Sequence, residues 1–282
     1  MARSILCGLI GAGIQRSLSP ALQEEEARHH GIRMHYQLID LDRAGAGVAA
    51  LPGLITAARI MGFAGLNITY PCKQSVIPLL DALSEEARAI GAVNAVICEG
   101  SRLVGHNTDG SGWSWGFRRA LPQADLSRVV LLGAGGAGSA CADAVLRLGA
   151  ARLVIVDREA PRAAELAERL NRHFDGSRAT AGADMASAVD GATGLIHATP
   201  TGMAKMPGMP LPEELLRPSM WVSEIVYVPL QTPLLGAARR IGCATADGGH
   251  MNVGQAIDGF RLFTGIEPDA GRMDAHFRHL VA

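Results

Sequence analysis

The chain has 282 residues and is poor in several features that mark particular classes of protein. Aromatic residues make up only 4%, and the formal net charge is −1 without a basic block. A nucleic-acid-binding protein needs a basic surface and rings on which bases stack, so we expect no nucleic-acid partner. No apolar run reaches the roughly 18 residues that span a membrane, and the N-terminal residues lack a signal-peptide pattern. We therefore expect a cytoplasmic protein with no membrane partner.

Cysteine is also scarce and scattered. The five cysteines form no C-x-x-C pair and have no histidine nearby at ligand spacing. This pattern is typical of reduced thiols in a core. A chain of this length can bury enough apolar surface without covalent or metal support. We expect no disulfide and no metal.

Lysine is nearly absent, since Lys73 and Lys205 are the only lysines among 26 basic residues. One interpretation is codon bias without functional content. The other is that a retained lysine transfers a proton, which arginine cannot do because a guanidinium keeps its proton in proteins. Both interpretations stay open on this observation. The glycine and prolines near Lys205 indicate a loop.

Apolar runs bounded by Gly, Pro, Asn and Asp alternate with helical patterns, which predicts an α/β fold. The expected strands are 5–10, 34–40, 65–69, 92–98, 102–106, 129–132, 152–156, 194–198, 221–226 and 242–246. The expected helices begin at Pro20 with Ser19 as N-cap, near Pro71 and at Ser84, and later cover 137–148, 161–172, 252–264 and 269–280. We place the domain boundaries near residues 110 and 240.

A dinucleotide-binding fingerprint lies between an expected strand and an expected helix. Residues 132–138 read Leu-Gly-Ala-Gly-Gly-Ala-Gly, so Gly133, Gly135 and Gly138 form G-x-G-x-x-G. These glycines allow, in turn, a tight turn, close approach of the backbone to a pyrophosphate, and close helix packing. Asp157 ends the next expected strand, where a carboxylate accepts hydrogen bonds from an adenosine ribose. We predict a Rossmann-type unit; the alternative is a glycine-tightened turn beside a surface Asp.

The charges around Asp157 bear on the choice between NAD and NADP. A carboxylate beside the ribose repels the 2′-phosphate of NADP, which favours NAD. Arg158 and Arg162 act in the other direction, because a guanidinium binds phosphate or stacks on adenine. We predict NAD, with NADP as the alternative.

The N-terminus imitates this fingerprint but lacks its last part. Gly11 and Gly13 follow the first expected strand, and Asp40 ends the second. Arg16 replaces the third glycine, and the next helix is expected only at Pro20, too far along for its N–H groups to hold a phosphate there. We predict that this turn binds no cofactor.

Lys73 and Asp109 both follow expected strands. Pro71 at the first helical position would place Lys73 in the first turn, where the helix dipole lowers a lysine pKa modestly and a larger change requires burial. Asp109 is either a helix cap or a carboxylate of a site.

Three further polar residues stand out. Asn94 lies in an apolar strand and needs polar partners, whether in a core or in a site. Ser17 and Ser19 are either loop and cap residues or hydroxyl donors to a substrate carboxylate.

Taken together, these motifs resemble those of the shikimate dehydrogenase family, in family order over nearly the whole chain. The segments are Ser17-Leu18-Ser19-Pro20, Asn67-Ile68-Thr69-Tyr70-Pro71-Cys72-Lys73, Gly91-Ala92-Val93-Asn94, Asn107-Thr108-Asp109-Gly110, Gly133 to Gly138, Ala198 to Met203, Val226-Tyr227-Val228-Pro229, Asp247-Gly248 and Gln255-Ala256. At position 157 the chain resembles the NAD-dependent quinate/shikimate dehydrogenase branch of the family, because it has Asp157 where the NADP enzymes typically have Asn-Arg-Thr.

The resemblance implies a substrate-binding domain at residues 1–110, an NAD-binding Rossmann domain at 111–240, and C-terminal helices at 241–282 that complete the first domain. It implies that Lys73 is the catalytic acid and base and that Asp109 is its partner. The implied substrate-binding residues are Ser17, Ser19, Thr69, Lys73, Asn94, Asp109, Tyr227 and Gln255. The implied cofactor-binding residues are Gly133, Gly135, Gly136, Ala137, Gly138, Asp157, Arg158 and Arg162, with Thr199, Pro200, Thr201, Gly202, Met203, Val226 and Gly248 beside the nicotinamide.

Several positions depart from the family pattern, among them Gly249-His250 in the segment before Gln255 and Arg158, which keeps one feature of the NADP enzymes. His197 stands where the family usually has Asn, and Glu224 stands where Asp is common. His197 is either a hydrogen-bonded residue at a strand end or a contact to a ligand. These departures bear on cofactor and substrate preference and leave the reaction class unchanged.

The sequence therefore predicts an oxidoreductase, a monomer or homodimer, that transfers hydride between NAD and a ring hydroxyl of shikimate, quinate or both. The products of oxidation are 3-dehydroshikimate and 3-dehydroquinate. One alternative is the NADP-dependent biosynthetic shikimate dehydrogenase. Another, of a different class, is a regulator that senses NAD and a hydroxy acid without turnover. Zinc-dependent and short-chain dehydrogenases fit less well, because the chain lacks a Cys/His zinc set and a tyrosine four residues before either lysine.

Overall fold

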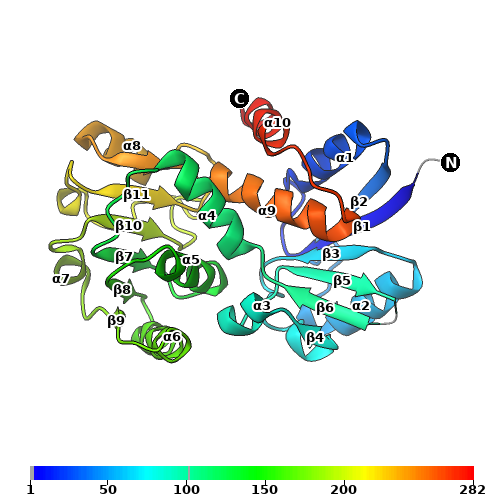
Figure 1. Ribbon diagram of the computed structural model, residues 1–282, viewed down its shortest axis with the longest axis horizontal. Helices are drawn as coiled ribbons and strands as arrows, with labels where there is room; N and C mark the ends of the chain where they lie inside the picture. Colours follow the sequence, from blue (N-terminus) through cyan, green and yellow to red (C-terminus); the bar gives the residue numbers. More distant parts are fainter. Residues whose placement is uncertain (1–2, 101) are drawn as a thin grey trace. The chain divides into compact units, whose positions relative to one another are not determined.

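The computed structural model describes residues 3–100 and 102–282 (Figure 1). The chain divides into two compact units: unit 1 is Met1–Thr108 with Gln255–Ala282, and unit 2 is Asp109–Gly254. The boundary expected near residue 240 falls inside unit 2. The chain stays in unit 2 beyond that point because β12 (Ala244–Ala246) pairs with β11 (Trp221–Glu224) in the sheet of that unit.

Unit 1 is built on a mixed sheet of order β2-β1-β3-β5-β6-β4. Its strands are β1 (Ser4–Gly11), β2 (Arg33–Asp40), β3 (Gly65–Ile68), β4 (Ala82–Leu83), β5 (Ala95–Glu99) and β6 (Arg102–His106). Strand β1 is parallel to β2 and β3, whereas β5 is antiparallel to β3 and β6. The helices are α1 (Ser19–His29), α2 (Leu51–Ile60), α3 (Glu85–Ile90), α10 (Ala270–Val281) and, from Gln255, α9 (Gly248–Thr264), with 3-10 turns at Val48–Ala50 and Ile77–Leu79.

The sheet of unit 1 is covered on both faces. Successive residues of a strand point to opposite sides, so neighbouring residues of β1 contact different clusters. Along β1, Cys7 and Leu9 join a cluster with Phe260 of α9, whereas Ile10 joins another cluster with Ile55 of α2. Helices therefore pack on both sides of β1, and its apolar run is continuous for that reason.

Unit 2 is a parallel sheet of order β12-β11-β10-β7-β8-β9 with helices on both faces (Figure 1). Its remaining strands are β7 (Val129–Leu132), β8 (Leu153–Val156), β9 (Ala179–Ala181) and β10 (Gly194–His197). Its helices are α4 (Asp109–Ala120), α5 (Gly136–Arg147), α6 (Ala160–His173), α7 (Met185–Val189) and α8 (Pro233–Ile241), the first turns of α9, and a 3-10 turn at Glu213–Leu215. This strand order is that of the doubly wound dinucleotide-binding fold, and the α/β prediction is confirmed.

The core of unit 2 shows the same alternation. Val129 and Leu131 of β7 join a cluster with α5 and α6, whereas Val130 and Leu132 join a cluster with α8. Both faces are buried, so the strand is apolar at every position. The five cysteines form no disulfide in the described structure, and four of them are buried. Burial raises the pKa of Cys7 to about 12. The reduced state of the cysteines stays a prediction from the sequence.

The helix expected near Pro71 is absent from the described structure, which has turns there before the 3-10 turn Ile77–Leu79. A helix would use the carbonyl of Lys73 to accept the N–H of Ile77. Instead, that carbonyl accepts the N–H of Val93 at 2.9 Å, and Ile77 N–H donates to Gln74. The helix-dipole argument for Lys73 was therefore wrong.

Elements that are short or weakly patterned were missed in the sequence: α2, α7, α8, β4 and β9. The strands expected at 102–106 and 129–132 have those bounds, and Ser84 is the N-cap of α3, accepting Ala87 N–H at 3.2 Å. Within the described ranges, no helix combines the length and apolar character needed to cross a bilayer.

Candidate functional site

The glycine turn after β7 is built as its sequence requires. Gly133 has φ +100°, and a Cβ there would lie 2.7 Å from the carbonyl oxygen of Ala198, which follows β10. A Cβ on Gly138 would lie 2.0 Å from the oxygen of Gly133, so only glycine lets α5 pack this closely on the turn. A Cβ on Gly135 would meet no described atom within 4 Å. The turn therefore has open space beside Gly135.

Helix α5 begins in this turn at Gly136, with Ala137 next. Its N-cap residue, Gly135, makes no side-chain capping bond in the described structure. The first N–H groups of a helix have no partner within the helix, and the dipole makes that end positive. The end of α5 thus suits a phosphate group.

Asp157 follows β8, next to the turn. Its carboxylate accepts the N–H of Ala134 at 2.7 Å and the N–H of Glu159 at 2.9 Å. A carboxylate has about four acceptor positions, so it still has capacity for ribose hydroxyls. Arg158 and Arg162 lie near Glu159, with nitrogen–oxygen distances of 3.8 and 3.1 Å. Their positive charges are therefore partly balanced within the same segment.

On the other side of the turn, the loop Thr199–Met203 follows β10. It contains Pro200 and Gly202, and it is held by bonds from Thr201 N–H to Thr199 Oγ1 at 3.3 Å and from Met203 N–H to the Pro200 oxygen at 3.1 Å. Thr199 also lies against the glycine turn, 3.0 Å from where a Cβ of Gly133 would stand. This loop and the turn are thus neighbours at one edge of the sheet.

The segment after β11 approaches the first residue of α9. A Cβ on Gly248 would lie 2.4 Å from the carbonyl oxygen of Val226, a distance that only glycine tolerates. Tyr227 is half-buried, and burial raises the pKa of its phenol. His197 and Glu224, at the ends of β10 and β11, are buried and hydrogen-bonded to each other at 2.9 Å. The structure thus decides the open question about His197 in favour of a bonded strand-end residue.

In unit 1 the structure brings the two serines together. Ser17 Oγ donates to Ser19 Oγ at 3.1 Å and accepts the N–H of Ser19 at 3.2 Å, and both residues are half-buried. The N-cap of α1 is Leu18, and Ser19 is the first helical residue, so the expected N-cap at Ser19 was wrong. The hydroxyl of Ser17 accepts the N–H of Ser19, the first N–H of the helix.

Lys73 and Asn94 are linked through the backbone of unit 1. Lys73 is half-buried, and its carbonyl accepts the N–H of Val93. Asn94 is 3% exposed; its Oδ1 accepts the N–H of Thr108 at 2.7 Å, and its Nδ2 donates to Thr108 Oγ1 at 3.0 Å. Asp109 follows Thr108 directly, is buried, and is the first residue of α4 in unit 2.

Two other predicted site residues of unit 1 are Thr69 and Gln255. Thr69 follows β3 and packs its methyl group against Gly11, 2.3 Å from where a Cβ would stand. Gln255 is half-buried in α9. Asn67 and Tyr36 were not predicted as site residues. The phenol of Tyr36 donates to Asn67 Oδ1 at 2.6 Å, and Asn67 Nδ2 donates to the Asn94 backbone oxygen at 3.2 Å. An asparagine inside an apolar strand was the available signal.

The N-terminal turn has a different role from the glycine fingerprint. The carboxylate of Asp40 accepts the N–H groups of Gly13 at 2.9 Å and Ile14 at 3.1 Å and the side-chain amide of Gln15 at 3.0 Å. Burial alone would raise the pKa of Asp40, but these bonds lower it. Asp40, at the end of β2, therefore stabilises the turn that follows β1.

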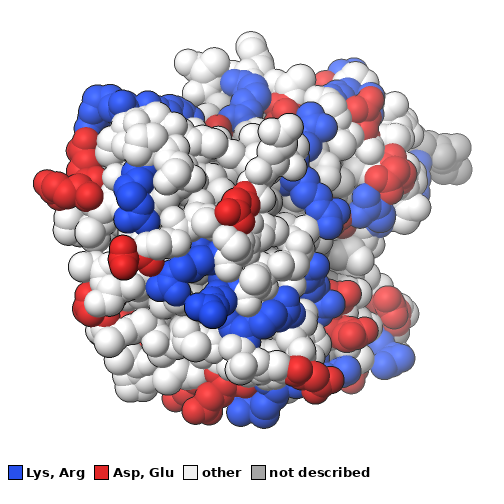
Figure 2. Space-filling model, turned by 60° about the vertical axis from the view of Figure 1, so that its left-hand side comes forward, with Lys and Arg blue, Asp and Glu red and all other residues white. Residues whose placement is uncertain are grey.

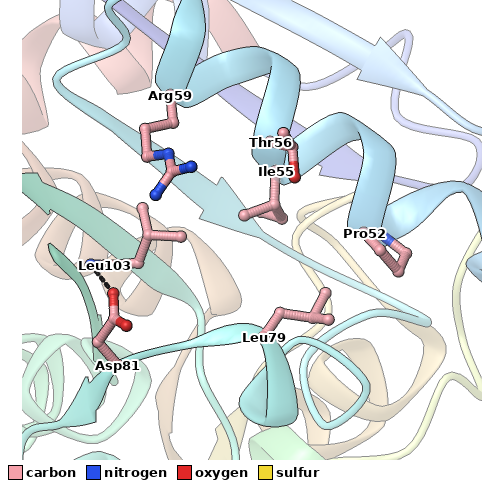
Figure 3. Close-up of a pocket in the computed structure, with 7 residues that line it drawn as sticks. All are labelled: Pro52, Ile55, Thr56, Arg59, Leu79, Asp81 and Leu103. Carbon is pink, nitrogen blue, oxygen red and sulfur yellow. Dashed lines mark hydrogen bonds between the residues drawn. The ribbon is translucent and has the colours of Figure 1, made fainter. Parts of the chain in front are cut away.

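Two cavities lie away from these residues. One, of about 190 Å³, is lined in unit 1 by Ile55, Leu79, Leu103, Arg59 and Asp81, together with Pro52 and Thr56 (Figure 3). The other, of about 490 Å³, contains three arginines, Arg128, Arg152 and Arg178, at the amino ends of β7, β8 and β9. These amino ends lie at the edge of the sheet opposite the glycine turn. On the face of the molecule that Figure 2 shows, Lys and Arg side chains lie among Asp and Glu side chains. In the described part of the chain, no group of three His, Cys, Asp or Glu side chains is arranged to hold a metal.

Comparisons with known proteins agree over nearly the whole chain. A model of the shikimate dehydrogenase substrate binding domain matches residues 9–96, and a model of shikimate / quinate 5-dehydrogenase matches residues 117–201. The chain is 58% identical over 280 residues to shikimate dehydrogenase (NADP(+)) of Streptomyces avermitilis, covering 99% of this chain and 96% of that protein. It is 44% identical over 281 residues to quinate/shikimate dehydrogenase (NAD(+)) of Corynebacterium efficiens, covering 98% and 99%. The solved structure of quinate dehydrogenase from Corynebacterium glutamicum in complex with NAD has a TM-score of 0.92 and 41% identity, covering 98% and 99%.

Proposed function

The chain belongs to the shikimate dehydrogenase family, and on that premise we propose that it transfers hydride between NAD and a ring hydroxyl of shikimate or quinate. The family consists of oxidoreductases that use a nicotinamide dinucleotide. The proposal concerns the finer points: which dinucleotide, which substrate, and which side chains move the proton. A cytoplasmic location and a monomeric or homodimeric state stay predictions from the sequence.

The edge of unit 2 fits a dinucleotide. The N-terminus of α5 is without a side-chain cap in the described structure, Gly135 leaves open space, and Asp157 retains acceptor capacity. These three features suit a pyrophosphate and an adenosine ribose, in the crevice where a doubly wound sheet binds such ligands. This juxtaposition is the observation that carries the proposal.

The charges around Asp157 favour NAD. A 2′-phosphate would face the carboxylate of Asp157, and Glu159 offsets the charges of Arg158 and Arg162. The alternative, NADP, is favoured by the name of the Streptomyces avermitilis relative. The name of the Corynebacterium efficiens relative favours NAD.

Proton transfer is assigned to Lys73. A bound nicotinamide dinucleotide supplies the hydride carrier, and the chain must move one proton. In oxidation, the neutral amine of Lys73 takes the proton of the reacting hydroxyl; in reduction, its ammonium returns it. Asp109 would orient the amine and a substrate hydroxyl. The backbone supports this pairing, because Lys73 is bonded to Val93, Asn94 is bonded to Thr108, and Asp109 follows Thr108.

The carboxylate of the substrate is assigned to Ser17 and Ser19. Their hydroxyls lie 3.1 Å apart, which suits two donors to one carboxylate. Asn94 and Thr69 in unit 1 are assigned to ring hydroxyls, as are Tyr227 and Gln255.

The test is a matrix of two cofactors and two substrates, with the absorbance of the reduced nicotinamide as readout. NAD and NADP at equal concentration are each combined with shikimate and with quinate. The proposal expects reduction of NAD with at least one substrate and a lower kcat/KM with NADP. Faster turnover with NADP would favour the biosynthetic alternative. Tight cofactor binding without turnover of either substrate would favour the regulator and overturn the proposal.

A further inference from the structure

Two ionisable side chains are buried side by side at the carboxyl edge of the sheet in unit 2. His197 and Glu224 are the last residues of β10 and β11 and are direct partners in the parallel register. Their side chains are 0% exposed. The Nδ1 of His197 lies 2.9 and 3.0 Å from the two carboxylate oxygens of Glu224. Burying a carboxylate is costly, so its partners must satisfy it completely.

The hydrogen bonds assign the protons of this pair. Glu224 Oε1 accepts the N–H groups of Ile225 at 2.9 Å and Val226 at 3.0 Å, and Oε2 accepts the hydroxyl of Thr232 at 3.0 Å. A carboxylate that accepts these donors also accepts from His197, so Nδ1 carries a proton.

The other ring nitrogen reaches the loop after β10. His197 Nε2 lies 2.5 Å from Thr199 Oγ1, which already accepts the N–H of Thr201. The hydroxyl of Thr199 can then donate its hydrogen to Nε2. With a proton on Nδ1 and none on Nε2, the imidazole is neutral, and both of its nitrogens are hydrogen-bonded.

Through these bonds the pair holds three segments in one arrangement. His197 fixes Thr199, Glu224 fixes Ile225 and Val226, and Thr232 caps α8 by accepting Leu235 N–H at 3.3 Å. A buried network whose members are all satisfied is rigid. The network thus fixes the position of the loop after β10 relative to the segment after β11.

These segments lie on one side of the glycine turn, and Asp157 lies on the other. The sheet order is β11-β10-β7-β8, the turn follows β7, and Asp157 follows β8. A dinucleotide with its pyrophosphate at the end of α5 and its adenosine ribose at Asp157 must extend its other half over the ends of β10 and β11. That half is the nicotinamide.

We propose that the His197–Glu224 pair positions the nicotinamide half of the cofactor by fixing the loop Thr199–Met203 and the segment at Val226. The inference rests on the proposed function for the identity of the cofactor. His197 and Glu224 are positioning residues: they take no part in proton transfer to the substrate. Replacing both residues should weaken binding of the nicotinamide half and leave binding of the adenosine half unchanged.

The test compares NADH with ADP-ribose, which has the adenosine and pyrophosphate but no nicotinamide. The variant is His197→Leu with Glu224→Met. It removes both members of the pair together, and with them the acceptor of the Ile225 and Val226 N–H groups. An unchanged Kd for ADP-ribose shows that the variant is folded. Titration calorimetry should show the Kd for NADH raised about tenfold and the Kd for ADP-ribose changed by less than about twofold. If the wild-type protein prefers NADPH, the titrations use NADPH and 2′-phospho-ADP-ribose in place of NADH and ADP-ribose.

Two further variants separate positioning from a general structural role. His197→Gln retains an amide that can donate to Glu224 and accept from Thr199, so it should restore most of the affinity for NADH. Ser223→Ala is the matched control: Ser223 is buried beside Glu224 in β11 but bonds Trp113 at 3.0 Å, and its loss should leave both Kd values unchanged.

The inference is overturned if the double variant weakens both ligands equally, if it weakens neither, or if His197→Gln is as weak as the double variant. Binding is measured without turnover, so a wild-type protein that binds NADH but oxidises neither substrate would contradict the proposed function alone. A wild-type protein that binds neither dinucleotide overturns both.

Discussion

The carboxylate of Asp157 accepts the backbone N–H of Ala134 at 2.7 Å. This bond joins the end of β8 to the glycine turn after β7, so the side chain that would contact a ribose also holds the turn that would contact a pyrophosphate. One side chain thereby sets the distance between the two parts of the proposed cofactor site.

Asp157→Asn should shift cofactor preference toward NADP. The amide oxygen can still accept the N–H of Ala134, so the turn is retained, while the negative charge that faces a 2′-phosphate is lost. A unit charge pair at close range near a surface is worth about 1 to 4 kcal/mol. The ratio of kcat/KM with NADP to that with NAD should rise by about tenfold or more. Asp190→Asn, an exposed carboxylate in the same unit, should leave the ratio unchanged.

Glu159→Gln should improve the use of NADP without affecting NAD. The carboxylate of Glu159 lies 3.1 Å from Arg162 and 3.8 Å from Arg158, and without it both guanidinium groups become available to a 2′-phosphate. We expect KM for NADP to fall several-fold at low ionic strength and the effect to shrink as salt is added. The matched control is Glu168→Gln in α6, the helix that begins directly after Glu159; the carboxylate of Glu168 lies 3.8 Å from the guanidinium of Arg172. An equal gain in that control would rule out this explanation.

Lys73→Ala should reduce kcat by about 10²- to 10⁴-fold, the usual contribution of general acid–base catalysis, while the Kd for NADH stays unchanged. Lys73→Arg should be equally inactive, because a guanidinium does not release its proton. Lys205→Ala, which removes the chain's other lysine from an exposed turn, is the control and should keep normal turnover. Turnover near the wild-type rate in Lys73→Ala would refute the assignment.

Arg272→Ala should destabilise unit 1 by about 3 kcal/mol at neutral pH, because it leaves a buried carboxylate without its main partner. Glu26 of α1 is 1% exposed in its side chain and accepts from Arg272 Nη2 at 2.6 Å, from His30 at 2.9 Å and from Asp269 N–H at 2.8 Å. Urea unfolding measures the loss. Arg28→Ala, which breaks an exposed pair with Glu25 on the same helix, should have little effect.

The contribution of Glu26 should also depend on pH. Burial alone would raise its pKa, but the bonds from Arg272, Asp269 and His30 lower it below the ordinary value of 4.5. Because the folded-state pKa lies below the unfolded one, the stabilisation is complete above about pH 4.5 and is lost as the pH falls through the folded-state pKa. The difference between wild type and Arg272→Ala should therefore shrink from about pH 7 to about pH 3. A difference that stays constant over this range would contradict the pairing.

Local patterns predicted some positions well and others wrongly. Gly133 and Gly138 were assigned their roles from spacing alone, because a turn that tight excludes any Cβ. Lys73 was placed in a helix because Pro71 favours a first turn, but the carbonyl of Lys73 is taken by Val93, twenty positions further along the chain. A bond between distant residues outweighs a local preference, and a single sequence does not display it.

The sequence by itself determined the α/β alternation, the glycine turn and the acid at the end of the next strand, since each depends on a few consecutive residues and on steric exclusion. Only the tertiary structure decided what His197 and Glu224 do. In the sequence they are two isolated polar residues; in the sheet they are register partners that are hydrogen-bonded to each other and hold the segments after β10 and β11. Burial and pairing across strands are properties of the folded chain, because they depend on which strands become neighbours.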